Sequence, residues 1–205
     1  MRTAPELAAD DPCLEGCLAG RPEAIEQLFK MYSPIVQRVI GRLIGPTADL
    51  EDLVQTTFVE TLRNLPRFRG EAKLSTWICG IAVHTAHHHL RAGKVRRHVP
   101  LELVAEKHLT VVQSENDHNI DSARLAVKLH ALLDQISPKK RIALLLYVIE
   151  DKSVEEIAAL MKATQAATRS RMFFARRELR KLIISDPELA SLADGMLKKA
   201  VGGER

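Results

Sequence analysis

The sequence predicts an all-α protein of two small helical domains joined by a flexible linker. Apolar residues recur at spacings of three and four along most of the chain, and no segment alternates long enough to indicate a sheet. A length of 205 residues suits one large domain or two small ones. Residues 99–122 lack sustained periodicity and aromatic residues, so we expect the linker there, between domains at 1–98 and 123–184 and before a tail at 185–205.

The first domain is expected to be a helical bundle. Its predicted helices are Pro22–Phe29, Ser33–Ile44, Asp49–Leu65 and a fourth that begins at Ser75. Asp49 and Ser75 are residue types that cap helix N-termini. The first two helices are expected to be separated near Met31 and Tyr32.

The second domain has the pattern of a helix-turn-helix. Two helices are expected near Ala123–Gln135 and Lys139–Ile149, and Ser153 with Glu156 has the spacing of a capping box at the start of a third. The short turn Lys162–Thr164 then leads into a cationic helix, as a recognition helix requires. Leu189, Leu192, Met196 and Leu197 predict one more amphipathic helix in the tail.

Composition predicts a cytoplasmic protein with no membrane insertion. Apolar residues make up 46% of the chain, but the longest unbroken apolar run, Ile142–Ile149, is far shorter than the roughly 20 residues that cross a bilayer. The first residues lack an apolar signal core. Three cysteines in such a chain favour reduced thiols over disulfides.

The net charge of +4 conceals two basic islands in an acidic background. Residues 63–98 carry eight basic side chains and one acidic one, and residues 169–181 carry six and one. Half of the eight aromatic residues also lie in these islands. Cationic segments attract phosphate and exposed rings stack on bases, so two islands favour nucleic-acid binding over solvated faces.

The second island predicts a helix that reads duplex DNA. Its inward stripe would be Met172, Ala175, Leu179 and Leu182, whereas Arg169, Phe173, Arg176, Arg177 and Arg180 share another face. The residues nearest the N-terminal end are the expected readers of base edges, namely Arg169, Ser170, Arg171 and Phe173. Arg177, Arg180 and Lys181 would hold phosphate. The alternative is an arginine-rich surface helix without a ligand.

The first island predicts single-strand capture. Its arginines and Lys73 accompany Phe68, Trp77 and the four histidines His84, His87, His88 and His89. A base stacked on an aromatic ring recovers about 1–3 kcal/mol, against about 1.4 kcal/mol for each separated step of DNA, so the island needs a large partner that holds the rest of the duplex. We expect Trp77 to be a core residue, since it aligns with Ile81 on the apolar stripe.

Both islands and their flanking helices resemble the extracytoplasmic-function (ECF) sigma factors of the sigma-70 class. Asp49–Arg91, which begins "DLEDLVQTTFVETLRNLPRFRG", resembles region 2, and Leu132–Leu182, which contains "SVEEIAALMKATQAATRSRMFF", is similar to region 4. The resemblance implies a transcription initiation factor that binds core RNA polymerase, reads the minus-35 element of promoter DNA as duplex and captures melted minus-10 bases. An anti-sigma factor is an expected partner.

The resemblance also implies roles for residues. Polymerase binding would involve Asp49, Glu51, Asp52 and Gln55, although acids in a first helical turn also complement the helix dipole. Minus-10 binding would involve Phe68, Arg69, Lys73, His84, His88 and Arg91. Minus-35 binding would involve Arg169, Ser170, Arg171, Phe173, Arg176, Arg177 and Arg180.

Two positions depart from the family pattern. His84 stands in "IAVHTA" where the family commonly has Asn, which could change the accepted base or make capture pH-sensitive. Ala166-Ala167 replaces the usual Gly-Thr opening of the recognition helix, which removes a cap and leaves the start of that helix undefined.

Other classes of protein fit less well. Cys79 and His84 lack a third, orienting group, so no catalytic residues are expected and the chain is not predicted to be an enzyme. Cys13 with Cys17 and His84 with His88 could each share a helix face, but neither pair supplies four zinc ligands, so no metal or cofactor is predicted. The serious alternative is a free-standing helix-turn-helix regulator, whose first domain should be a receiver or ligand pocket.

Overall fold

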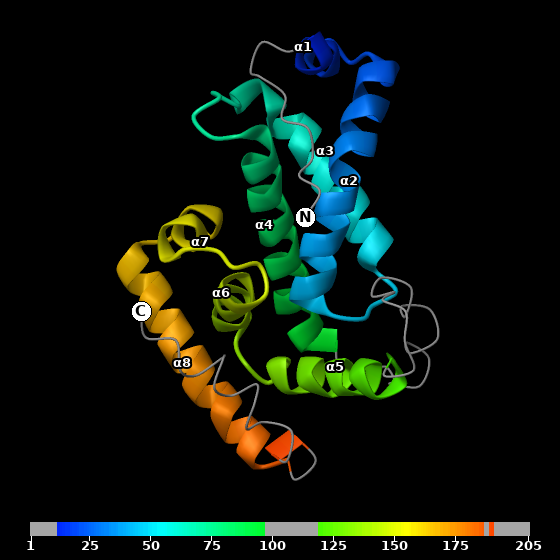
Figure 1. The fold of residues 1–205 in the computed structure, drawn as a ribbon. Coiled ribbons are helices and arrows are strands. Elements are labelled where there is room, and N and C mark those ends of the chain that lie inside the picture. The colour runs from blue at the N-terminus through cyan, green and yellow to red at the C-terminus, as the bar shows by residue number, and fades with distance from the viewer. Residues whose placement is uncertain (1–11, 97–118, 187–188, 191–205) are drawn as a thin grey trace.

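The computed structural model describes residues 12–96, 119–186, 189 and 190. Within that part of the chain every regular element is a helix, which confirms the predicted fold class. The elements, shown in Figure 1, are α1 (Pro12–Leu18), α2 (Pro22–Ile44), α3 (Leu50–Asn64), the 3₁₀ turn η1 (Leu65–Arg67), α4 (Leu74–Arg96), α5 (Asn119–Leu133), α6 (Pro138–Val148), α7 (Val154–Leu160) and α8 (Gln165–Ile184).

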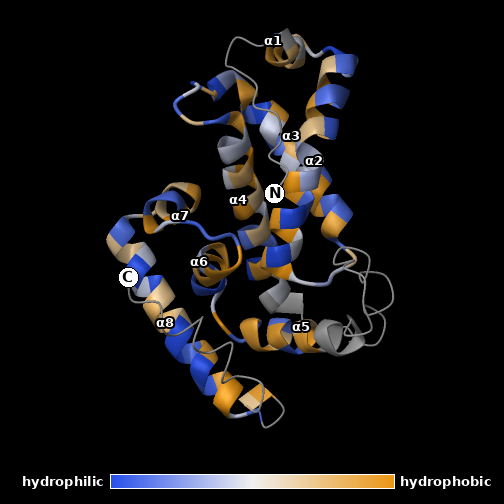
Figure 2. Cartoon of the chain, viewed as in Figure 1, coloured by the Kyte–Doolittle hydropathy of each residue, from blue (hydrophilic) through white to orange (hydrophobic). Residues whose placement is uncertain are grey.

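Helices α1 to α4 form the first bundle. α2 lies against α1, α3 and α4, and α3 also packs on α4. Each helix turns its apolar face inward, where Tyr32, Ile40, Phe58 and Ile78 are buried. Hydrophobic and hydrophilic residues accordingly alternate along α2 (Figure 2).

The predicted break near Met31 and Tyr32 is wrong, because α2 continues through it as one helix of 23 residues. Pro34 lies inside this helix and lacks the N–H that would bond to the preceding turn. Its flanking residues Tyr32 and Val36 are fully buried, while Pro34 itself faces solvent. Packing of the apolar face therefore outweighs the local cost of the proline.

Helices α5 to α8 form the second domain, in which α6 and α7 both pack on α8. The predicted capping box is confirmed: the Glu156 N–H donates to the Ser153 hydroxyl at 3.2 Å, and the Ser153 N–H donates to the Glu156 carboxylate at 2.8 Å. The helix expected near Ala123 starts earlier, at Asn119.

The start of α4 also differs from expectation. It begins at Leu74, and the Trp77 N–H donates to the Lys73 carbonyl at 3.0 Å, so Ser75 lies in the first turn instead of capping it. Residues 99–118 of the predicted linker lie outside the described residues. So does the amphipathic helix predicted from Leu189 to Leu197, apart from residues 189 and 190. No helix of the described part is long and apolar enough to span a membrane.

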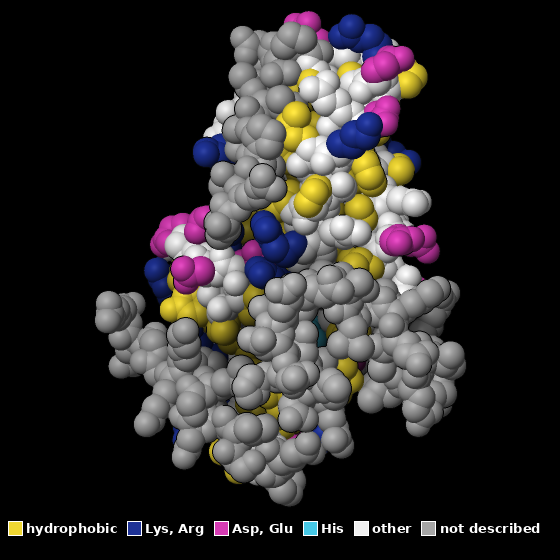
Figure 3. All heavy atoms as spheres, turned by 45° about the vertical axis from the view of Figure 1, so that its right-hand side comes forward, with side chains coloured by type: hydrophobic (Ala, Val, Ile, Leu, Met, Phe, Trp, Pro, Cys, Tyr) yellow, Lys and Arg dark blue, Asp and Glu magenta, His cyan; other side chains and the backbone are white. Residues whose placement is uncertain are grey.

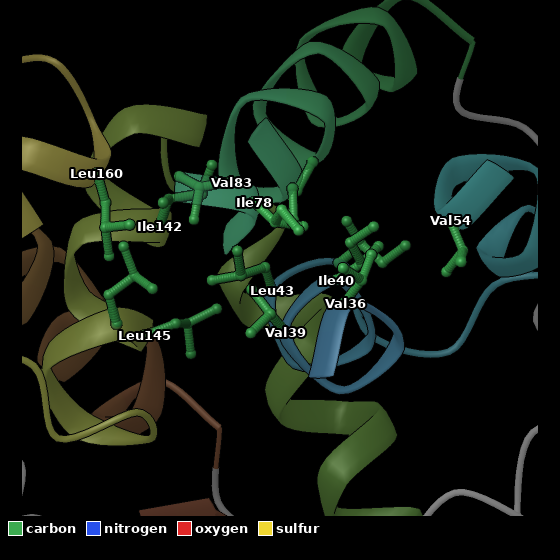
Figure 4. Close-up of a cluster of buried hydrophobic side chains, with 14 of the residues drawn as sticks. Val36, Val39, Ile40, Leu43, Val54, Ile78, Val83, Ile142, Leu145 and Leu160 are labelled. Carbon is green, nitrogen blue, oxygen red and sulfur yellow. The ribbon is translucent and has the colours of Figure 1, made fainter. Parts of the chain in front are cut away.

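The two domains pack directly against each other. α4 contacts α6 and α7, and α2 contacts α6. Buried side chains of both domains form one continuous cluster, in which Val83 of α4 lies beside Ile142 of α6 and Leu160 of α7 (Figure 4). On the face shown in Figure 3, the surface of the first domain carries cationic, anionic and apolar side chains side by side.

Candidate nucleic-acid interface

Helix α8 presents a cationic face beside two exposed aromatic rings, Phe173 and Phe174. Thr168, Met172 and Ala175 are buried against the domain, whereas Leu179 and Leu182 of the predicted inward stripe are only partly buried. On the opposite side Phe173 is 62% exposed. The exposed polar and charged residues on that side are Arg169, Ser170, Arg177 and Arg180.

Not all of the predicted duplex-binding residues join this face. The guanidinium carbon of Arg176 lies 4.8 Å from the centre of the Tyr147 ring, so this side chain packs on α6. Arg171 is half-buried. Five of the seven residues predicted for minus-35 binding therefore lie together on the exposed face of α8. The other two, Arg171 and Arg176, are partly buried.

The start of α8 is fixed by a side-chain cap. The Ala167 N–H donates to the Thr164 hydroxyl at 3.2 Å, which makes Thr164 the N-cap. The missing Gly-Thr pair therefore leaves α8 capped, by a residue that the sequence analysis had placed in the turn. This cap holds the N-terminal end of α8 next to Arg169 and Ser170.

A second candidate face runs along α4. Trp77, His84, His88 and Arg91 follow one another at spacings that keep them on one side of a helix, over a length of about 21 Å. His84, His88 and Arg91 are exposed. The ring of Phe68 lies 5.2 Å from that of Trp77, so the loop after η1 joins this stripe at its N-terminal end.

Phe68 and Trp77 are both half-buried and pack against the core cluster. Trp77 is therefore neither fully buried, as a core residue would be, nor a free platform. Arg69 and Lys73 are exposed on the same loop, and Arg69 lies 4.0 Å from the Glu71 carboxylate. The loop and the first turn of α4 thus combine two cations with a partly buried pair of rings.

The two exposed histidines of this stripe, His84 and His88, lie one helical turn apart on α4. Their ring centres are 4.6 Å apart. Partial burial, followed by the neighbouring His88 charge, lowers the pKa of His84. A neutral imidazole both donates and accepts hydrogen bonds, so His84 can recognise a base edge without the charge that would favour any phosphate.

The residues predicted to bind polymerase surround the start of α3. Glu51, Asp52 and Gln55 are exposed. Asp49 is the N-cap residue, but its side chain makes no cap hydrogen bond and lies 3.9 Å from His89 of α4. The acids therefore form an open anionic surface at the positive end of the helix dipole.

In the described part of the chain, thiols and histidines form no larger cluster. Among the described residues no group of three or more His, Cys, Asp or Glu side chains could hold a metal ion. Cys13 and Cys17 are buried in α1, and burial raises the pKa of Cys17 to about 11. That thiol is protonated at neutral pH and is a poor nucleophile.

One structurally central residue was missed by the sequence analysis. Arg141 of α6 is 1% exposed and bonds to backbone carbonyls of α2. Its spacing from Leu144 and Leu145, on the buried side of α6, was the only sequence signal for its position. Lys139-Lys140-Arg141 otherwise has the character of a solvent-exposed basic run.

Comparison with known proteins identifies both domains. Residues 28–96 match the family model for sigma-70 region 2, and residues 126–179 match the model for sigma-70 region 4. These ranges contain the α4 stripe and most of α8 respectively.

Individual relatives match over nearly their whole length. RNA polymerase sigma factor CarQ of Myxococcus xanthus is 32% identical, over 80% of this chain and 91% of its own. RNA polymerase sigma-H factor of Pseudomonas aeruginosa is 29% identical, over 85% and 93%. The fold resembles that of sigma factor RpoE from Bartonella quintana, solved with the anti-sigma factor NepR: the TM-score is 0.54, at 20% identity, over 78% of this chain and 97% of that one. The chain therefore belongs to the sigma-70 family and is an ECF-type RNA polymerase sigma factor.

Proposed function

We propose that this sigma factor reads its promoters with two separate surfaces, α8 for the minus-35 duplex and the α4 stripe for single-stranded minus-10 DNA. The observation that carries the proposal is the exposed face of α8, where Phe173, Arg177 and Arg180 stand out from a helix whose other side is buried. A helix of this kind fits the major groove, and its arginines can bind guanine or phosphate.

The α4 stripe suits a base that has left the duplex. Arg69, Lys73 and Arg91 supply positive charge at both ends, and the neutral His84 lies between them. Phe68 and Trp77 provide the apolar surface on which a base edge or face can rest. The proposed division is therefore charge for the backbone and His84 with Phe68 for the base.

Core RNA polymerase is proposed to bind the anionic surface of α3, through Asp49, Glu51, Asp52 and Gln55. The exposure of the last three residues supports this assignment, as does the family match over α2 to α4. We further propose domains at 1–98 and 123–184 with a linker at 99–122, a cytoplasmic location and no catalysis. An anti-sigma factor is also a proposed partner, because the Bartonella quintana protein of similar fold was solved in complex with one.

The experiment is a footprint and run-off transcription assay with and without core polymerase. We expect protection at minus-35 and minus-10, and specific transcripts, only with polymerase present. Protection of the same sites by the chain alone would instead favour a free-standing regulator, and no transcript above background on any promoter fragment of the source genome would refute the proposal.

Two variants separate the surfaces. Arg177→Ala should weaken promoter binding of the holoenzyme, with normal polymerase affinity, and Asp52→Ala should weaken polymerase affinity alone. Matched controls are Lys30→Ala, which removes an exposed cation, and Glu23→Ala, which removes an exposed acid from the first turn of α2. Equal defects from Arg177→Ala and Asp52→Ala would contradict separate roles.

A further inference from the structure

Arg141 bonds across the boundary between the two domains. Its Nε donates to the Leu43 carbonyl at 3.0 Å, and its terminal nitrogen donates to the Ile44 carbonyl at 2.8 Å. Both carbonyls belong to the last turn of α2, where helix carbonyls lack partners within the helix and carry the negative end of the dipole. A side chain of the second domain thus completes a helix of the first.

The charge of Arg141 is compensated from its own domain. A second terminal nitrogen is paired with the Asp134 carboxylate. The terminal nitrogen that donates to Ile44 also contacts Nδ1 of His130, at 3.1 Å. Because a guanidinium only donates, Nδ1 must accept, so His130 is neutral with its proton on the other ring nitrogen. The buried cation is therefore held in one orientation, aimed at α2.

Two further contacts join the domains around this residue. Arg42 of α2 forms an ion pair with Glu150, N to O 2.8 Å, and the Glu150 side chain is only 12% exposed. Val83 of α4 packs with Ile142 and Leu160 in the continuous core cluster (Figure 4). The packed arrangement is thus specified by polar and apolar contacts together.

This arrangement conflicts with simultaneous binding to both promoter elements. The minus-35 and minus-10 elements are numbered by their distance from the transcription start, so they lie about 25 base pairs apart. This is roughly 85 Å along B-DNA at 3.4 Å per pair. Here α4 touches α7, which packs on α8. Moreover, burial first, and then the charge of Lys139 of the second domain, lowers the pKa of His87 on α4; for His84 burial and His88 come first, and Lys162 adds to them. The second domain thus stands beside the proposed minus-10 surface.

We propose that Arg141 is an interdomain latch that holds the free protein in a closed, self-inhibited form, which core polymerase must open. This inference rests on the proposed function, because inhibition has meaning only if α4 and α8 bind separated DNA elements. When most of the free protein is closed, its apparent affinity for polymerase is reduced in proportion to the small fraction that is open. Loss of the latch should therefore strengthen polymerase binding, although no contact with polymerase is gained.

The test compares Arg141→Met with Lys140→Met in the full chain. Both remove a cation from the same turn of α6, but Lys140 is paired with Glu178 inside the second domain. In small-angle X-ray scattering of the free protein, Arg141→Met should increase the radius of gyration, and its affinity for core polymerase should rise by about tenfold. Lys140→Met should match the wild type in both measurements.

The Arg42–Glu150 ion pair provides an independent check. Arg42→Glu and Glu150→Arg should each expand the free protein and tighten polymerase binding, and the double variant should restore both values towards wild type. These variants decide the question if circular dichroism shows that Arg141→Met fails to fold. Wild-type size and affinity in the folded Arg141→Met protein, or in all three charge variants, would overturn the latch. Absence of transcription by the wild-type holoenzyme would instead overturn the proposed function, so the two failures are distinguishable.

Discussion

Arg176 and Arg177 are neighbours in the sequence with different expected roles. Arg177 is exposed beside Phe173, whereas Arg176 stacks on Tyr147. Helical geometry separates adjacent side chains by 100°, so one can meet DNA while the other packs on α6. The sequence analysis placed both on one face because their spacing from Arg169, Phe173 and Arg180 permits it.

The salt dependence of promoter binding should distinguish these two arginines. Arg177→Ala should reduce the slope of log K against log salt by about 0.9, the value for one lost phosphate contact. Arg176→Ala should leave the slope unchanged and lower the free energy of unfolding by about 0.5–1 kcal/mol, because it loses a cation–π contact. Holoenzyme binding to promoter duplex at several salt concentrations and urea unfolding of the free chain measure the two effects. Equal slope changes would contradict the assignment.

The buried His130 predicts a pH dependence of stability. Burial, followed by the charge of Arg141, lowers its pKa to about 4, and Asp134 offsets only part of this. Between pH 6.5 and 4 the unfolded chain binds a proton that the folded protein does not, so the free energy of unfolding falls as the pH falls, by up to about 3 kcal/mol. Above pH 6.5 this residue should contribute no pH dependence.

The matched variant is His130→Asn, whose side-chain oxygen can accept from Arg141 but does not titrate. Urea unfolding curves of the full chain between pH 4 and 7 should diverge, with the wild type losing more stability than the variant towards acid. Carboxylates titrate equally in both proteins, so the difference isolates His130. Parallel pH profiles would show that His130 is accessible to protons in the folded state.

At the scale of helices, local signals located most elements but did not fix all their ends. The Ser153–Glu156 box and the turn before α8 were predicted, because capping depends on nearby residues alone. The continuity of α2 through Pro34 was not, because burial of Tyr32 and Val36 depends on α3 and α4. The start of α8 was undefined because only the structure shows which hydroxyl reaches the Ala167 N–H.

The N-cap of α8 should contribute measurably to the stability of the free protein. Thr164→Ala should lower the free energy of unfolding by about 1 kcal/mol, since a helix N–H loses its acceptor. Thr164→Ser keeps the hydroxyl and is the matched control. Thermal unfolding of the free chain measures this loss of stability. If the two substitutions have the same effect, the hydroxyl contact does not hold the end of α8.

At the scale of the molecule, the sequence predicted two domains on a linker but gave no account of how they meet. The uninterrupted apolar run of α6 contained part of the answer, because Ile142, Leu144 and Leu146 point in different directions yet all are buried. A helix that is apolar on every side lies in an interior. Here α7 and α8 cover part of α6, and α2 and α4 of the first domain pack on it as well. The polar end of that contact, Arg141, needed the structure.

The continuous cluster of buried side chains has a thermodynamic consequence for the free sigma factor. Two domains that share a core lose stabilising contacts together, so heating should produce a single endotherm whose calorimetric and van't Hoff enthalpies agree. If Arg141→Met releases one domain from the other, the scan should separate into two smaller peaks. Two independent peaks in the wild type would show that each half melts without regard to its neighbour.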